Sequence, residues 1–335
     1  MYIKKKPYFI AEVGVNHNGR LNLAKKLILG AKKAGADAIK FQSFIAENLV
    51  KKNAPKVAYQ IDKKNSSETH FQMLKKLELS FKDQKKLLSF CKKLNIEFIS
   101  TPFDIQSAFY LKKLGVNIIK ISSGDLTDFT LHETISKFNI DTIISTGMAN
   151  MFEIERTLKL YKNKSKVSLL HCVSNYPAAI NSQNLKVIKL MKNKFKCRLG
   201  YSDHTVGDLA SIVAVADGAE IIEKHITLDN RMKGPDHKAS MELKDLKSFI
   251  YKLKNVNLAK GKNEKKCQSE ESKTKKISRK SLYFSKKLSK GHRLEKNDFI
   301  TLRPAKGLDP FHIKKLINKK LSRNVKKFQI VSRKI

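Results

Sequence analysis

Two histidines, His204 and His225, each lie at the end of an apolar run that is typical of a buried strand, and they stand 21 residues apart. Neighbouring parallel strands lie about 4.8 Å apart, so two inward imidazoles at equal height could share one metal ion at roughly 2.1 Å. Two imidazoles without thiolates, with room for water and a substrate oxygen, suit an exchangeable divalent ion such as Mn²⁺ or Zn²⁺. From spacing alone, two unrelated histidines with hydrogen bonds of their own are the simpler interpretation, and a metal pair is the alternative.

Two lysines interrupt other apolar runs, Lys40 in AIKFQSF and Lys120 in IIKISSG. A buried lysine must be paired, and an anionic ligand such as a phosphate or a carboxylate would pair it. Hydroxyl groups in other runs could donate hydrogen bonds to the same anion: Thr101, Ser123, Ser145 and Ser202. Three alternatives stay open, namely a structural salt bridge for the lysines, strand-end caps for the hydroxyls, and a Schiff-base lysine of the kind that barrel aldolases use.

All these residues belong to a series of eight short apolar runs, at 8–16, 38–44, 97–103, 118–124, 142–148, 167–176, 198–204 and 221–227. Between the runs lie stretches such as FKDQKKLLSFCKKLN, in which apolar residues recur every three or four positions and predict helices. Apolar strands separated by helices indicate a parallel sheet that is covered on both faces. Eight such units in about 230 residues favour a closed (β/α)8 TIM barrel over an open doubly wound sheet, with the active site at the carboxyl ends of the strands.

The composition of the chain changes after the last predicted barrel helix. We predict a TIM-barrel catalytic domain over residues 1–260, a polar linker over 261–277, and a small C-terminal β-rich domain of short strands and turns over 278–335. Within the barrel, the polar segment from about 45 to 68 is too long for an ordinary strand-to-helix connection. Loops of this kind on barrels usually carry function.

The formal net charge of +39 raises the question of a nucleic-acid ligand. Only nine of the 69 basic residues are arginine, and the lysines are spread over every predicted helix instead of forming one stripe. This pattern is typical of solvated helix faces, so we predict no nucleic-acid partner. No apolar run approaches the roughly 18 residues of a membrane span, and the four cysteines form no CxxC pair. We therefore expect a cytoplasmic protein with reduced thiols and no membrane partner.

Nine motifs occur along the chain in a characteristic order: AEVGVNHNG, KFQ, STPFD, KISSGDLT, STGMA, LLHCVSNYP, GYSDHT, EKHITLD and GPDHKAS. In this order they resemble the sialic acid synthase family, which condenses phosphoenolpyruvate with an N-acylated mannosamine. The resemblance covers almost the whole chain, because SLYFSKKLSKGHRL and LRPAKG resemble the antifreeze-like (SAF) domain of that family. It implies a homodimer in which the C-terminal domains are swapped between partner chains.

The resemblance implies an N-acetylneuraminate synthase-type transferase that joins phosphoenolpyruvate to N-acetylmannosamine or a related acylated mannosamine and releases phosphate. The alternative is an N,N'-diacetyllegionaminate synthase acting on 2,4-diacetamido-2,4,6-trideoxymannose. Pseudaminate synthase and a Schiff-base sialate lyase are further candidates. The sugars of the first two differ at C4 and C6, where one side chain could decide between them.

The resemblance also implies roles for individual residues. His204 and His225 would hold a divalent metal, Mn²⁺ first with Mg²⁺ or Co²⁺ as alternatives, and Glu12 would handle a proton or orient the attacking water. Phosphoenolpyruvate would be bound by Lys40, Thr101, Lys120, Ser123, Ser145, Ser174 and Ser202. The sugar would be bound by Gln42, Asn65, Asp125, Tyr176, Asp236 and, from a partner chain, Arg303.

Some positions depart from the pattern of the family or have no role in it. Ser174 stands where an asparagine is common, with Asn175 beside it, and Asp125 is one methylene shorter than the more usual glutamate. These changes bear on which sugar is bound. Glu223 shares the inward parity of His225, so we expect it to support the site, whereas Lys224 points the other way and is expected to be solvated or paired under the helices.

Overall fold

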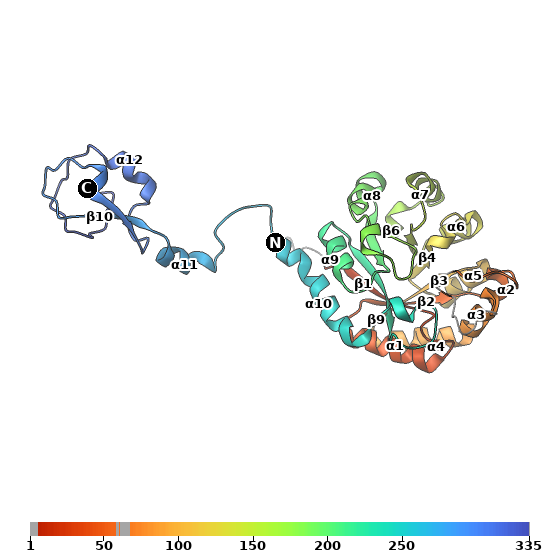
Figure 1. Ribbon diagram of the computed structural model, residues 1–335. Coiled ribbons are helices and arrows are strands. Elements are labelled where there is room, and N and C mark those ends of the chain that lie inside the picture. Colours follow the sequence, from red (N-terminus) through yellow and green to blue (C-terminus); the bar gives the residue numbers. More distant parts are fainter. Residues whose placement is uncertain (1–5, 58–59, 61–67, 335) are drawn as a thin grey trace. The chain divides into compact units, whose positions relative to one another are not determined.

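Eight parallel strands close into a barrel in a computed structural model that describes residues 6–57, 60 and 68–334 (Figure 1). The strands are β1 (Tyr8–Gly14), β2 (Ala38–Ser43), β3 (Glu97–Pro102), β4 (Ile118–Ile121), β5 (Asp141–Ser145), β6 (Val167–Cys172), β7 (Arg198–Asp203) and β8 (Ile221–Thr227). Each pairs with the next in sequence order, and β8 pairs with β1 to close the sheet. The predicted (β/α)8 barrel is confirmed, because only a closed sheet lets β8 neighbour both β7 and β1.

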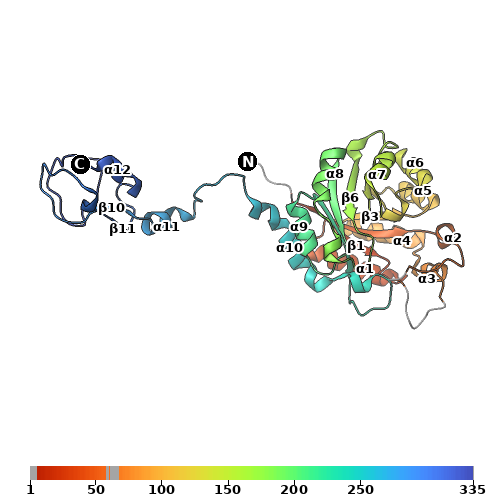
Figure 2. The same ribbon diagram turned by 45° about the horizontal axis from the view of Figure 1, so that its top comes forward.

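Helices form an outer ring around these strands, as Figures 1 and 2 show. They are α1 (Leu21–Ala34), α4 (Phe81–Leu94), α5 (Ile105–Leu114), α6 (Phe129–Ser136), α7 (Met151–Leu158), α8 (Val187–Phe195), α9 (Leu209–Ala216) and α10 (Leu243–Lys260). Their ends follow from the local sequence: the Ser80 side chain accepts from the Asp83 amide at the start of α4, and Gly35 ends α1 in the left-handed conformation. Two further helices, α2 (Ala46–Leu49) and α3 (His70–Leu77), lie in the long connection between β2 and α4.

The interior of the barrel has an apolar floor and a polar upper layer. Six inward side chains form the floor: Ile10, Ala38, Ile99, Ile143, Leu170 and Ile221. Two residues further along β1 and β2, the paired positions are Glu12 and Lys40, which are also buried. Because strand side chains alternate between faces, the residues one step away point outward and pack under the helices. The floor therefore closes one end of the barrel, and the polar residues line the other.

The chain divides into two units, Met1–Gly261 and Lys262–Ile335. In the second unit, β10 (Ser281–Phe284) pairs antiparallel with β11 (Phe299–Leu302), and buried residues such as Leu282, Leu294 and Val331 form its core. The second unit also contains α11 (Glu271–Ser278) and α12 (Ile313–Leu316). Most of α11 falls within the segment that was predicted as a linker, where the Lys276 carbonyl accepts from the Ala305 amide. Across the described residues, no helix combines the length and apolar composition needed to cross a bilayer.

Candidate active site

A cavity of about 410 Å³ lies at the carboxyl ends of the barrel strands. Its walls contain fourteen of the sixteen predicted site residues: Glu12, Lys40, Gln42, Thr101, Lys120, Ser123, Asp125, Ser145, Ser174, Tyr176, Ser202, His204, His225 and Asp236. Of the other two, Asn65 lies outside the described residues, and Arg303 is an exposed residue of the second unit. The predicted site residues that line this cavity are spread over more than 200 positions of sequence, and the order of the strands brings them together.

The two predicted lysines are buried and contact carboxylates. Lys40 Nζ lies 2.9 Å from Glu12 Oε2 and donates to Thr101 Oγ1 at 3.1 Å. Lys120 Nζ donates to Ser145 Oγ at 2.6 Å. The lysines are therefore paired with acceptors inside the protein. An anionic ligand in the cavity would contact two ammonium groups and two hydroxyl groups that line the same cavity.

Glu223 joins the two lysines. Its Oε2 lies 3.8 Å from Lys40 Nζ, its Oε1 lies 3.8 Å from Lys120 Nζ, and Ser202 Oγ donates to Oε1 at 2.9 Å. The sequence interpretation gave Glu223 only a supporting role, and its inward parity was the one signal available. The structure makes it the shared counter-ion of both lysines, because β2, β4 and β8 converge inside the closed barrel.

Burial controls the charges in this cavity. It raises the pKa of Glu12 to about 7, against the opposing effect of Lys40, because the carboxylate is removed from water. Burial also raises the pKa of Asp236 and that of Asp125, each to about 6. It lowers the pKa of Lys120, while the pKa of Lys40 is raised because Glu12 and Glu223 outweigh burial. Three carboxyl groups therefore titrate close to neutral pH, as acid–base catalysis requires.

His204 directly follows the end of β7 and His225 lies in β8, each one residue beyond the paired positions Asp203 and Lys224, and their ring centroids are 5.8 Å apart. His204 Nδ1 lies 2.7 Å from the Val173 carbonyl oxygen, to which it can only donate, so Nε2 is left as the acceptor nitrogen. His225 Nδ1 is buried, lies 4.0 Å from Asp236 Oδ2 and has no hydrogen-bond partner among the residues that the structure describes. Burial lowers the pKa of His204 to about 4 and that of His225 well below its usual value. Both rings are therefore neutral at pH 7 and can offer a lone pair.

These features fit an exchangeable divalent ion. A Cβ at Gly14 would lie 3.1 Å from His225 Cε1 and 3.3 Å from both Asp236 Oδ2 and Glu12 Oε1, so the glycine keeps the space beside His225 open. No set of three or more His, Cys, Asp or Glu side chains within the described part of the chain has the arrangement of a metal site. The chain thus presents two imidazoles, and an ion bound to them would take its other ligands from water and substrate.

Aromatic and apolar residues complete the walls. The Tyr176 ring lies 4.1 Å from the ring of His204 and 5.7 Å from that of His225, measured between centroids. Side chains of the long connection after β2 form another wall, among them Leu49, Val50, His70, Met73 and Leu74. The sequence indicated a functional role for that connection from its length and polarity, and the resemblance implied Asn65 as its contact with the sugar, but neither pointed to these apolar residues and His70.

Comparison with known proteins identifies the family. A sequence model described as the NeuB family matches residues 27–265. The chain belongs to the NeuB family. This NeuB chain is 45% identical over 331 residues to the N,N'-diacetyllegionaminic acid synthase of Campylobacter jejuni, covering 98% of this chain and 99% of that protein. It is 41% identical to the enzyme of the same name from Legionella pneumophila, covering 95% and 91% of the two chains.

A solved structure extends the comparison to the fold. The NeuB chain is 36% identical to the N-acetylneuraminic acid (sialic acid) synthetase of Leptospira borgpetersenii, crystallised with citrate. The structural match has a TM-score of 0.72 and covers 81% of this chain and 90% of that chain. The predicted resemblance to the sialic acid synthase family is confirmed.

Proposed function

We propose that this chain condenses phosphoenolpyruvate with 2,4-diacetamido-2,4,6-trideoxymannose to form N,N'-diacetyllegionaminate and phosphate. The observation that carries the proposal is one cavity that holds two buried lysines beside two neutral histidines. The choice of sugar is supported by the two NeuB relatives of highest identity given above, both named N,N'-diacetyllegionaminic acid synthase. Asp125, the shorter replacement for the usual glutamate, is the residue that we expect to contact the distinguishing part of the sugar.

Phosphoenolpyruvate brings two anionic groups to the cavity. Lys40 and Lys120 would neutralise them, and their hydroxyl partners Thr101 and Ser145 would donate further hydrogen bonds. Ser123, Ser174 and Ser202 stay predicted contacts of the same ligand. Since Glu223 lies 3.8 Å from the ammonium groups of both lysines, the ligand would have to loosen this carboxylate from at least one of them.

The histidine pair would hold a divalent ion, for which we propose Mn²⁺, with Mg²⁺ and Co²⁺ as alternatives. When bound, such an ion supplies Lewis-acid polarisation of the sugar aldehyde. The chain itself would orient the open-chain sugar through Gln42, Asp125, Tyr176 and Asp236. His204 would be held in the required tautomer by its hydrogen bond to the Val173 carbonyl.

Three bond changes complete the reaction. The C3 carbon of phosphoenolpyruvate forms a bond to the aldehyde carbon, water adds to the C2 carbon that has become electrophilic, and the bond from C2 to the phosphate-bearing oxygen breaks. Glu12, with a pKa of about 7, is suited to take the proton of the added water. The aldehyde oxygen is protonated to a hydroxyl and phosphate leaves, so that atoms and charge balance.

A second candidate is N-acetylneuraminate synthesis from N-acetylmannosamine. The observation that favours it is the match to the sialic acid synthetase structure of Leptospira borgpetersenii. The chemistry at the reacting carbons is the same for both sugars. They differ only at C4 and C6, which lie away from the bond that forms.

The test is phosphate release with three sugars: the diacetamido-trideoxy precursors of legionaminate and pseudaminate, and N-acetylmannosamine. We expect release with Mn²⁺ that requires both substrates, is fastest with the legionaminate precursor, and stops with a chelator. Fastest release with N-acetylmannosamine would favour the second candidate. No release with any sugar would contradict the synthase proposal, and borohydride trapping of pyruvate on a lysine would favour the lyase.

Replacing Lys120 by methionine should weaken phosphoenolpyruvate binding. The change removes one charge-assisted hydrogen-bonding group, worth about 1.5–3 kcal/mol, so KM for phosphoenolpyruvate should rise by about ten- to 150-fold. Steady-state kinetics at saturating sugar measure this rise. The matched control is Lys26→Met, an exposed lysine of α1, which should leave KM unchanged. Equal KM values for the two variants would remove Lys120 from the binding site.

We also propose the domain-swapped homodimer that the resemblance implies, with Arg303 serving the cavity of the partner chain. Mixing a His225→Ala chain with an Arg303→Ala chain, each inactive alone, tests it. If the domains are swapped, each mixed dimer has one site with both residues intact, and the mixture should recover about a quarter of the unmodified activity after subunit exchange. No recovery in a verified mixed dimer would show that both residues serve one chain.

A further inference from the structure

Behind the histidine pair, on the outer face of the same strands, lies a buried ion pair that the proposed reaction does not use. Lys224 Nζ donates to Asp203 Oδ2 at 2.8 Å, and the two side chains are only 1% and 0% exposed. The residues are Cα partners in the register of β7 and β8. Lys224 is thus paired under the helices, one of the two outcomes that its outward parity predicted.

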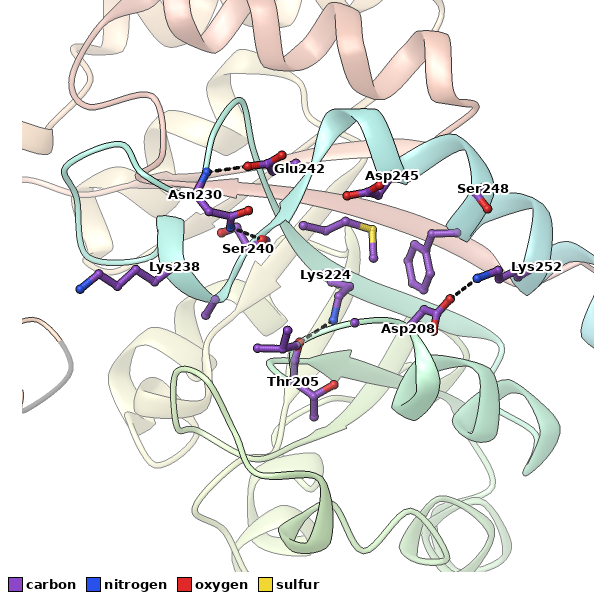
Figure 3. A pocket seen from close by; sticks show the side chains of 15 residues that line it. Thr205, Asp208, Lys224, Asn230, Lys238, Ser240, Glu242, Asp245, Ser248 and Lys252 are labelled. Carbon is purple, nitrogen blue, oxygen red and sulfur yellow. Dashed lines mark hydrogen bonds and ion pairs between the residues drawn. The ribbon is translucent and has the colours of Figure 1, made fainter.

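The pair fixes the chain on both sides of His204. Asp203 accepts from the Thr205 amide and hydroxyl, each at 2.8 Å, and from Ser211 Oγ at 2.6 Å. Lys224 Nζ also donates to the Thr205 carbonyl oxygen at 2.8 Å, the bond drawn in Figure 3. The residues before and after His204 are therefore both tied to Lys224, the residue that precedes His225.

Strand alternation links this outer pair to the inner face. Immediately below it, the paired inward residues Ser202 and Glu223 are joined by a hydrogen bond of 2.9 Å. Immediately above it lie His204 and His225, which have no hydrogen bond to each other, and within the described part of the chain His225 Nδ1 accepts or donates no hydrogen bond. The outer pair is thus the last side-chain link between the two strands before the histidines.

Stability does not account for an ion pair at this place. Removing both charges from water costs several kcal/mol per ion, and replacing such a pair by apolar residues of similar volume is often neutral or stabilising. The pair instead restrains the positions of the two strands. A carboxylate that accepts several hydrogen bonds and an ammonium group that donates to two acceptors can keep all these bonds in only a few backbone positions. Two well-packed apolar side chains would restrain the position of β7 relative to β8 along the strand direction less strictly.

We propose that Asp203 and Lys224 are positioning residues that set the separation and height of His204 and His225 for a divalent ion. The proposal rests on the metal-binding role given to these histidines in the proposed function. Neither residue touches a substrate or the ion. They act through the backbone of β7 and β8.

Lys224 also lines a second cavity, and this limits which substitutions can test the pair. It has a volume of about 450 Å³, and Thr205, Lys224, Ser240 and Phe249 are among its lining residues (Figure 3). A shortened side chain at Lys224 would open this cavity toward the strands and admit water. Length-conserving changes avoid this defect, so the variants are Asp203→Asn, Lys224→Met and the double variant that carries both.

The experiment measures Mn²⁺ affinity by the electron paramagnetic resonance signal of free Mn²⁺, together with thermal unfolding and kinetics. Each single variant leaves one buried charge unpaired and should lower the unfolding midpoint, whereas the double variant should recover most of that loss. The Kd for Mn²⁺ should rise by about ten- to 100-fold in all three, as outer-shell changes typically cause. In the double variant kcat should fall while KM for phosphoenolpyruvate stays unchanged.

A control away from the histidines is the partly exposed ion pair between Lys192 of α8 and Glu220, which directly precedes β8, with Nζ 2.5 Å from Oε1. Lys192→Met with Glu220→Gln should leave Mn²⁺ affinity and kcat unchanged. Recovery of Mn²⁺ affinity along with stability in the double variant would overturn the positioning role and leave the proposed function intact. Failure of the unmodified chain to bind Mn²⁺ would overturn the metal assignment and this proposal together.

Discussion

Replacing His225 by alanine should abolish phosphate release and leave the barrel folded. The imidazole is neutral at pH 7 because burial lowers its pKa, and its Nδ1 makes no hydrogen bond to any residue in the described ranges that the fold would lose. Its removal takes away one of the two nitrogens proposed to hold the metal. Metal polarisation of a carbonyl is worth several kcal/mol, so kcat should fall by at least about a thousandfold.

Two measurements separate this loss from a loss of folding. Mn²⁺ titration should show no specific binding to His225→Ala, while circular dichroism and the thermal midpoint stay close to those of the unmodified chain. The control is His132→Ala, which changes a buried histidine of α6 whose Nδ1 lies 2.8 Å from the Tyr161 hydroxyl. That variant should lose stability and keep Mn²⁺ affinity. Substantial turnover by a folded His225→Ala chain would remove His225 from the metal site.

Replacing Glu12 by glutamine should have the second large effect. A positioned acid–base group contributes about 10²- to 10⁴-fold, so kcat should fall within that range. Burial gives Glu12 a pKa of about 7, and a base acts only when ionised, so kcat/KM of the unmodified chain should rise with pH through about 7. The histidines stay neutral throughout this window because burial lowers their pKa values. Glutamine should remove this rise from the pH profile.

Unfolding provides a check on Glu12 that is independent of catalysis. The folded pKa of about 7 lies above the ordinary 4.5, so the unfolded chain ionises first as the pH rises. Glu12 therefore reduces folding stability progressively from about pH 4.5 to about pH 7, and the reduction stays constant above that. The stability of Glu12→Gln should fall less between pH 5 and pH 8 than that of the unmodified chain. An identical decline in both chains would show that Glu12 is not a raised-pKa group.

The sequence alone was sufficient to predict the order of the strands and most of the polar residues that line the cavity. Apolar runs alternating with amphipathic stretches predicted the barrel, and the polar ends of those runs placed Lys40, Lys120, His204 and His225 at one mouth. This works because strand alternation and the parallel arrangement are local rules, readable from spacing. The motif order then indicated the family, which the comparisons confirm.

Only the tertiary structure decided how these residues meet. Glu223 lies between Lys40 and Lys120 because the barrel closes and brings β8 near β2 and β4, which no local spacing encodes. The neutral state of the histidines and the raised pKa of Glu12 follow from complete burial. For Lys224, the sequence predicted only that the side chain points outward from the barrel. The register of β7 and β8 identifies Asp203 as its partner. Parity along a strand determines the face of a side chain, whereas its neighbours and its charge depend on how distant strands close around it.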